Sequence, residues 1–135
     1  MSNVLRITEA ASLALHTMKI LSNGHDKLIT TKDIAEILNA SEAHLSKVMQ
    51  RLVKSGLIKS TRGPKGGFIL AKSAKEITLK EIYETIEQPF GENRCLLAKQ
   101  ACNGKNCIFG NLLESINTQV KEYFCNTKLS DFQDR

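Results

Sequence analysis

The most constraining feature of this sequence is a pair of short amphipathic segments followed by a glycine-rich turn, all between residues 30 and 70. The first segment opens with Thr30 three residues before Asp33, a spacing typical of a capped helix start, and it breaks at Asn39. Ser41 is a favourable cap for the second segment, and Gly56 can adopt the left-handed conformation after its last turn. The pattern therefore predicts two helices joined by a tight turn.

The second of these helices is predicted to have two distinct faces. Its apolar residues recur at intervals of three and four positions, so they form one face for packing. These residues are Leu45, Val48, Met49 and Leu52. The outward face carries short or hydrogen-bonding side chains that can approach base edges, and a lysine that can reach guanine or phosphate. We expect this helix to contact DNA through Ala43, His44, Ser46, Lys47, Gln50 and Arg51.

A small β-hairpin is predicted directly after the two helices. Residues 57–61 and 68–70 have the composition of strands, and residues 62–67 form the turn between them. This turn is not a nucleotide-binding loop, because it lacks the spacing of that motif and joins two strands. Two helices and a hairpin make a winged helix-turn-helix, a mainly α fold whose second helix enters the major groove of DNA. The charges and glycines of the hairpin tip extend the expected DNA contacts to Arg62, Gly63, Lys65 and Gly66.

The positive charge of the chain is concentrated in its first half. The formal net charge is +5, but residues 1–72 hold 11 basic and 5 acidic side chains, whereas residues 73–135 hold 8 and 9. Seven lysines or arginines and no acidic residue lie between Lys47 and Lys72 inclusive. Such a basic block is typical of a polyanion partner, although a solvated basic face has the same composition. Together with the helix pair and the hairpin, the block predicts DNA binding.

Three further helices are predicted around this unit. Apolar spacing indicates one over residues 7–21, Thr78 caps another that runs to about Glu87, and a long amphipathic helix begins at Ile108. The last residues are polar and are expected to fray. The predicted organisation is a DNA-binding domain at 1–72, a linker helix at 73–92, a cysteine loop at 93–107, a long C-terminal helix at 108–127 and a tail at 128–135.

Three of the four cysteines, Cys95, Cys102 and Cys107, lie within thirteen residues with the spacing C-x6-C-x4-C. Three thiolates on one loop can converge on a metal centre that prefers sulfur ligands. The spacing matches no common zinc-finger pattern, and it leaves open an iron–sulfur cluster, a zinc ion, a thiol–disulfide switch or no ligand role. Cys125 stands apart and is expected to be a partly buried small residue. No histidine lies near the three cysteines and no hydrolase motif is present, so an enzyme is not expected.

The sequence does not predict export or membrane insertion. No apolar stretch approaches the roughly 18 residues of a spanning helix, and the first ten residues lack the apolar run of a signal peptide. With 41% hydrophobic residues, the chain has enough apolar side chains for a core. We therefore expect a cytoplasmic protein whose thiols stay reduced.

These motifs resemble the Rrf-two family of bacterial transcription regulators. The matching segments are residues 5–8, 52–58, 60–68 and 77–79, together with the three-cysteine loop and the C-terminal helix, so the likeness covers nearly the whole chain. The resemblance implies a homodimer held largely by the long C-terminal helix, and a palindromic operator in double-stranded DNA. It implies a repressor that senses nitric oxide, redox state or iron–sulfur status. The DNA contacts that it implies are Ser41, Ala43, Ser46, Lys47 and Arg62.

The resemblance also implies an iron–sulfur cluster, either 2Fe–2S or 4Fe–4S, with Cys95, Cys102 and Cys107 as ligands. Some cluster-binding members place a histidine three residues after the last cysteine, where this chain has Gly110. The fourth ligand is therefore not the histidine of those members.

Other cluster-binding members supply a carboxylate from the first helix of the partner subunit, where this chain has Ser12, with Glu9 nearby. The candidates for the fourth ligand are thus Glu9, Ser12, Asn111 or a small thiol. The alternative is an iron-free regulator of the same family, switched by thiol oxidation, zinc, a small molecule or a partner protein.

Overall fold

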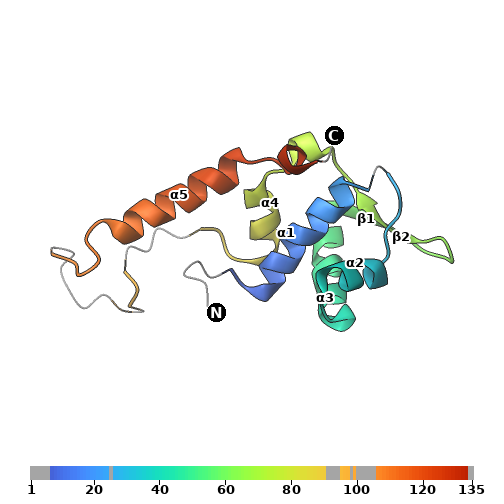
Figure 1. Cartoon of the computed structure of the whole chain (residues 1–135), viewed down its shortest axis with the longest axis horizontal. Helices are drawn as coiled ribbons and strands as arrows, with labels where there is room; N and C mark the ends of the chain where they lie inside the picture. Colours follow the sequence, from blue (N-terminus) through green and yellow to red (C-terminus); the bar gives the residue numbers. More distant parts are fainter. Residues whose placement is uncertain (1–6, 25, 91–94, 98, 100–105, 134–135) are drawn as a thin grey trace.

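Helix α1 (Glu9–Ser22) lies at the centre of the fold in the computed structural model, which describes residues 7–24, 26–90, 95–97, 99 and 106–133 (Figure 1). The helix begins two residues after its predicted start, because the Thr8 hydroxyl accepts a 3.2 Å hydrogen bond from the Ala11 amide and caps the first turn. Ala11 and Ala14 are fully buried. These small side chains let neighbouring helices approach the α1 backbone closely.

Helices α2 (Thr31–Leu38) and α3 (Glu42–Lys54) form the predicted helix-turn-helix. The Thr30 hydroxyl accepts a hydrogen bond from the Asp33 amide at 3.1 Å. Asn39 ends α2 in the left-handed conformation with a φ of 52°, so the chain reverses within a few residues before α3 begins. The predicted breaks and caps of both helices are confirmed.

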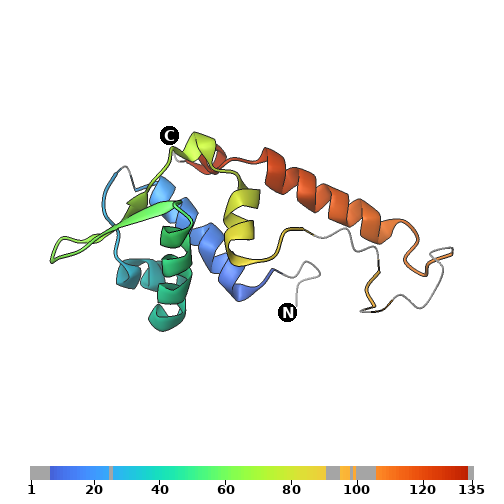
Figure 2. The same ribbon diagram turned by 180° about the vertical axis from the view of Figure 1, so that it is seen from behind.

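Strands β1 (Ile58–Thr61) and β2 (Gly67–Leu70) form the predicted antiparallel hairpin, in which Ile58 pairs with Leu70 and Thr61 with Gly67. The hairpin extends from one end of the molecule in both views (Figures 1 and 2). The two helices and this hairpin constitute a winged helix, and the chain as a whole is mainly α, as the sequence predicts.

Helix α4 (Leu79–Ile86) follows a short 3-10 helix, η1 (Ala74–Glu76), and packs against both α1 and α3. The Thr78 hydroxyl caps α4 by accepting a 3.1 Å hydrogen bond from the Glu81 amide. Ile82 is fully buried and Ile86 is 5% exposed. The helix thus closes the core against α1 and α3. From its C-terminal end the chain continues into the cysteine segment, the cysteine loop predicted at 93–107.

Helix α5 (Leu112–Asn126) extends away from the rest of the molecule and contacts α4 near its own C-terminal end (Figure 2). It begins four residues later than predicted, because Gly110 has a positive φ of 56° that interrupts the helical path. Phe124 makes the contact with α4, where its ring meets Tyr83 and Phe90 edge-on at centroid distances of 5.6 and 5.2 Å. Burial and the nearby Glu87 carboxylate raise the pKa of Tyr83.

Residues 127–133, which follow α5, do not fray, contrary to the prediction from their polarity. A second 3-10 helix, η2 (Leu129–Phe132), returns to η1, and Leu129 is only 1% exposed. The Leu129 amide donates a 2.8 Å hydrogen bond to the Ile77 carbonyl. Gln133 Nε2 donates to the Ser22 carbonyl at the end of α1. One apolar side chain and these two polar contacts therefore fix the segment in place.

The hydrophobic core joins α1, α3 and α4 around side chains that are almost completely buried. Its largest fully buried members include Met18, Ile34, Leu45, Met49, Leu52, Ile77 and Ile82. Among the described residues, no helix is both long enough and apolar enough to cross a bilayer.

Candidate nucleic-acid interface

Helix α3 presents one row of polar and small side chains to solvent. Its four predicted core residues are exposed by no more than 2% of their surface. Ala43, Lys47 and Gln50 are exposed, and Ser46 is partly buried beside them. Because positions 43, 47 and 50 are separated by four and three residues, their side chains lie along one helical face. This row has the spacing and chemistry that base edges require.

The start of α3 is fixed by two contacts of predicted DNA-binding residues. The Ser41 hydroxyl oxygen accepts a 3.2 Å hydrogen bond from the His44 amide, which leaves the hydroxyl proton available to a phosphate oxygen. The Nδ1 atom of His44 lies 3.8 Å from Oε1 of Glu9 in the first turn of α1. The first turn of α3 therefore lies beside the first turn of α1.

Arg51 is placed differently from the other predicted contacts. Its Nη2 donates a 2.8 Å hydrogen bond to the carbonyl oxygen of Ile86, the last residue of α4. The guanidinium is therefore engaged at α4 rather than in the row that contains Lys47. The physical reason is that the end of a helix leaves carbonyl groups without intrahelical donors, which a nearby arginine satisfies.

The hairpin turn presents Arg62, Gly63 and Lys65 as exposed residues. The Gly66 amide donates a 2.9 Å hydrogen bond to the Gly63 carbonyl inside the turn. A β-carbon at Gly66 would lie 2.2 Å from the Thr61 carbonyl oxygen, so no other residue fits there without a shift of the backbone. The turn itself thus requires this glycine, whether or not DNA approaches it.

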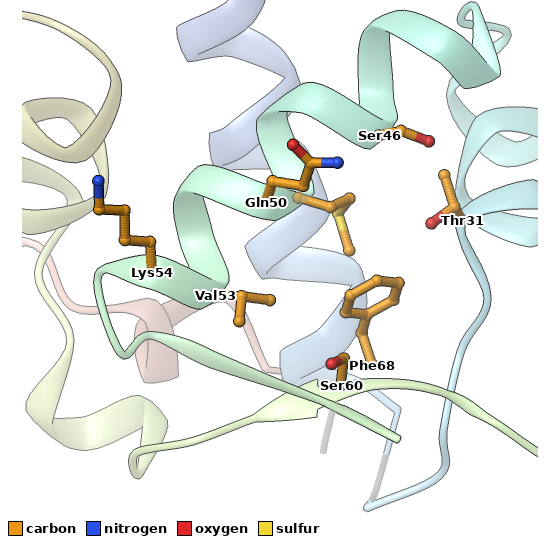
Figure 3. A pocket seen from close by; sticks show the side chains of 8 residues that line it. Thr31, Ser46, Gln50, Val53, Lys54, Ser60 and Phe68 are labelled. Carbon is orange, nitrogen blue, oxygen red and sulfur yellow. The ribbon is translucent and has the colours of Figure 1, made fainter. Parts of the chain in front are cut away.

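A groove of about 370 Å³ separates the outward face of α3 from the hairpin (Figure 3). Its polar lining includes Thr31, Ser46, Gln50 and Ser60, contributed by α2, α3 and β1. Its apolar lining consists of Met49, Val53 and Phe68. In Figure 3 the hydroxyls of Ser46 and Thr31 point toward the space between α3 and α2. The groove therefore runs between α3 and the hairpin, with hydrogen-bonding groups along its edge.

Thr31 and Phe68 line this groove, although the sequence pattern did not predict either of them as part of a site. Phe68 is placed there because its backbone bridges to Ile29, in the segment before α2. The sequence did contain one indication of an extended segment at this position. It is the apolar pair Leu28 and Ile29, directly before the Thr30 cap.

The basic block keeps most of its charge free of ion pairs. Among the described residues from Lys47 to Lys72, only Lys72 forms an ion pair, with Glu81 at 2.8 Å. The hydrogen bond and the charge of that carboxylate raise the pKa of Lys72. The exposed cations of α3 and the hairpin, including Lys47, Arg62 and Lys65, therefore remain available to an anionic partner.

The cysteine segment is described only in part. Cys95 and Cys107 are partly buried, whereas Cys102 lies outside the described residues. The Phe109 amide donates a 3.4 Å hydrogen bond to Sγ of Cys107. No group of three metal-binding side chains occurs within the described ranges. Cys125, predicted to be partly buried, is exposed, because the neighbouring Phe124 occupies the side of α5 that contacts α4.

The candidates for a fourth ligand lie in two separate regions. Glu9 is paired with His44, and Ser12 Oγ lies 3.4 Å from Nδ1 of His16, all near the start of α1. Asn111 precedes α5 and forms no side-chain capping bond. Both views show the start of α5 at the opposite end of the molecule from the hairpin and well away from α1 (Figures 1 and 2). The described residues of one chain therefore do not bring these candidates together.

Comparison with known proteins gives consistent matches over nearly the whole chain. The family model Rrf2, described as "Iron-dependent Transcriptional regulator", matches residues 7–135. A protein of Aquifex aeolicus (strain VF5) named as an HTH-type transcriptional regulator is 30% identical over 127 residues, covering 92% of this chain and 88% of that protein. The HTH-type transcriptional regulator IscR of Yersinia pseudotuberculosis serotype O:1b (strain IP 31758) is 27% identical over 129 residues, covering 94% and 78%.

Solved structures with the same fold include CymR (YrzC), the global cysteine regulator of B. subtilis. It has a TM-score of 0.77 and 29% identity, and the match covers 95% of each chain. The oxidized form of Staphylococcus aureus CymR has a TM-score of 0.73 and 26% identity over 93% of each chain. The proteins that this chain is similar to are transcriptional regulators rather than enzymes. The match over residues 7–135, the winged helix and the exposed face of α3 together show that the chain belongs to the Rrf2 family of transcriptional regulators, the Rrf-two family that its motifs predict.

Proposed function

We propose that this regulator is a homodimeric repressor that binds a palindromic operator and senses nitric oxide, redox state or iron–sulfur status through a cluster held by Cys95, Cys102 and Cys107. In this proposal, residues 1–72 bind DNA, residues 93–107 sense the signal and residues 108–127 hold the dimer together. The exposed row of Ala43, Lys47 and Gln50 beside the wing is the observation that carries the DNA-binding role. As a regulator of bacterial genes, the protein would act in the cytoplasm.

The DNA-binding role follows from how α3 and the hairpin are placed. The row on α3 has the length and chemistry to read the major groove, while Arg62 and Lys65 at the hairpin tip can enter the adjacent minor groove. The groove between them would then face one DNA backbone, where the hydroxyls of Thr31, Ser46 and Ser60 can donate to phosphate oxygens.

The dimeric state is supported by an apolar stripe on α5. Leu112 and Tyr123 are eleven residues apart, close to three helical turns, and are 54% and 53% exposed. Ile116 and Val120 lie between them and are partly buried. A second copy of the same helix can cover this stripe, and a two-fold dimer would present two recognition helices to two half-sites.

The sensing role is supported by the chemistry and the position of the cysteines. The thiols of Cys95 and Cys107 are partly exposed, which suits soft ligands for iron, and Cys102 would supply the third thiol. When bound, an iron–sulfur cluster would supply a centre that nitric oxide, oxygen or iron shortage can damage. The cysteine segment joins the end of α4 to the start of α5, so its order can alter the relative position of the DNA-binding and dimer-forming parts.

Two measurements on the protein purified without air test this proposal. Visible absorbance with iron and sulfide analysis tests the cluster, and a colourless protein without iron would contradict it. Selection of duplexes from a random-sequence library tests DNA binding, with enrichment of a palindrome as the expected result. A protein that enriches no sequence would contradict the operator-binding role independently of the cluster.

The second candidate is an iron-free regulator that thiol oxidation switches. The partly exposed thiols of Cys95 and Cys107, together with the likeness to the oxidized form of Staphylococcus aureus CymR, favour it. In this case two thiols would give two electrons and two protons to an oxidant such as hydrogen peroxide and form a disulfide. Protein without iron whose DNA affinity changes with peroxide and recovers with dithiothreitol would select this candidate.

A further inference from the structure

We propose that Arg51 is a positioning residue that fixes the recognition helix α3 against the end of α4, rather than a residue that touches DNA. The proposal rests on the DNA-binding function proposed above. Its basis is the 2.8 Å hydrogen bond from Arg51 Nη2 to the carbonyl oxygen of Ile86, which joins residues 35 positions apart. Lys47, in the row proposed to face DNA, lies one helical turn before Arg51. The bond therefore fixes α3 at a point next to that row.

The Ile86 carbonyl needs a donor that α4 itself cannot provide. Ile86 is the last residue of α4, and the next amide, that of Glu87, donates back to Tyr83 at 2.9 Å. Pro89, just beyond, has no amide hydrogen to offer. The carbonyl also lies at the negative end of the α4 dipole, where a guanidinium is favourable. The contact therefore satisfies a group that would otherwise lack a partner beside the core.

The recess around Arg51 offers no hydroxyl donor with which to bind an anion. It has a volume of about 330 Å³ and is lined by Arg51, Lys54, Ser55 and Thr85. The Ser55 hydroxyl donates to the Leu52 carbonyl at 2.8 Å, and the Thr85 hydroxyl donates to the Glu81 carbonyl at 2.9 Å. Because both hydroxyl protons are used within their own segments, neither hydroxyl is left to donate to an anion in the recess.

Other contacts fix the C-terminal end of α4 in place, so this end can hold α3 in a defined position. The Thr8 hydroxyl at the start of α1 donates a 2.5 Å hydrogen bond to Oε1 of Glu87. Tyr83 stacks on Phe90 with a centroid distance of 4.4 Å and an interplanar angle of 6°. Arg51 thus connects α3 to a helix end that is already joined to α1 and to the start of the cysteine segment.

The test compares three variants on two DNA probes over a range of salt concentrations. The probes are a duplex that the wild-type protein enriches from a random library and a scrambled duplex of the same composition. Arg51→Met removes both the charge and the donor, and Arg51→Lys keeps the charge and one donor. Lys80→Met is the matched control, since it removes one charge from the exposed surface of α4 and lies outside the groove between α3 and the hairpin.

We expect Arg51→Met to bind the enriched duplex about tenfold more weakly, which corresponds to the loss of one charge-assisted hydrogen bond. Binding to the scrambled duplex and the salt dependence should stay as in the wild type, because a tilted helix loses base contacts but no phosphate contact. Arg51→Lys should recover most of the loss, and Lys80→Met should bind both duplexes as the wild type does.

Two results would overturn the proposal. Equal weakening on both duplexes, with a salt slope smaller by about one, would show that Arg51 contacts phosphate. If Arg51→Met binds both probes as tightly as the wild-type protein does, the bond between Arg51 and Ile86 does not position α3 for DNA binding. If Arg51→Met fails to fold by circular dichroism, Arg51→Lys decides, with a twofold to threefold loss confined to the enriched duplex as the expected result. A wild-type protein that enriches no duplex would instead contradict the proposed function.

Discussion

Phe68 in strand β2 exchanges two backbone hydrogen bonds with Ile29, at 2.8 Å from the Phe68 amide and 3.1 Å from the Ile29 amide. The pair attaches the hairpin to the segment that leads into α2. The wing is thereby fixed relative to the helix-turn-helix, and Phe68 becomes part of the groove beside α3.

Replacing Gly67 with alanine should disturb this attachment. A β-carbon at position 67 would lie 3.0 Å from the Ile29 backbone, and the φ of +154° is strained for any other residue. We expect Gly67→Ala to lower the free energy of unfolding by about 2 kcal/mol in urea titrations. Gly63→Ala is the control, because its φ of +110° is also strained but its β-carbon meets nothing within 4 Å. Equal losses in the two variants would show that the close approach to Ile29 adds nothing.

Replacing Thr17 with valine should stabilise the protein. Thr17 is fully buried in α1, and its Oγ1 has no hydrogen-bond partner among the described residues. Valine keeps the shape of the side chain and removes the unsatisfied hydroxyl. The expected gain in the free energy of unfolding is about 1 kcal/mol, measured by urea titration. A loss of stability would reveal a partner for the hydroxyl.

Replacing Phe124 with alanine should detach α5 from α4. The Phe124 side chain is 8% exposed and meets the rings of Tyr83 and Phe90. We expect a loss of about 3 kcal/mol in the free energy of unfolding and faster hydrogen exchange in the last turns of α5. Glu122→Ala, an exposed change on the same helix, should alter stability by less than about 0.5 kcal/mol.

Placing a charge on the apolar stripe of α5 should separate the proposed dimer. Ile116→Glu puts a carboxylate in the middle of the stripe, and burying it in the interface is unfavourable. We expect the dimer dissociation constant to rise at least about 100-fold in sedimentation experiments. Thr118→Glu, on the opposite side of α5, is the matched control and should leave it unchanged. Loss of the dimer in both variants would place the interface elsewhere.

Removing the charge of Lys47 should weaken DNA binding, because this lysine side chain can reach a phosphate oxygen or a guanine edge. Lys47→Ala should lower the affinity for an enriched duplex about tenfold in fluorescence anisotropy titrations. If Lys47 contacts phosphate only, the loss will be equal on a scrambled duplex and the salt slope will fall by about one. Lys75→Ala, an exposed lysine on η1, controls for the general loss of charge. Unchanged affinity of Lys47→Ala would refute the assigned DNA-facing surface.

Local chemistry predicted the parts of this fold that depend on neighbouring residues. Ser41 and Thr78 cap their helices, and Gly56 takes the left-handed conformation with a φ of 85°, because a cap or a turn involves only residues within a few positions. The inward face of α3 follows from its spacing alone. The start of α5 was predicted too early, since apolar residues continue before Gly110 whereas the helical backbone does not.

The sequence by itself determined the winged helix, the family and the outward row of α3, because short-range spacing and capping decide which faces are apolar and which are polar. Only the tertiary structure decided that Arg51 bonds to Ile86, that Leu129 is buried and that Phe68 joins the groove. These contacts link residues far apart in the chain, so they depend on which carbonyl or apolar surface the packing leaves uncovered. A residue's type limits the contacts that it can make, and the packing of distant segments selects among them.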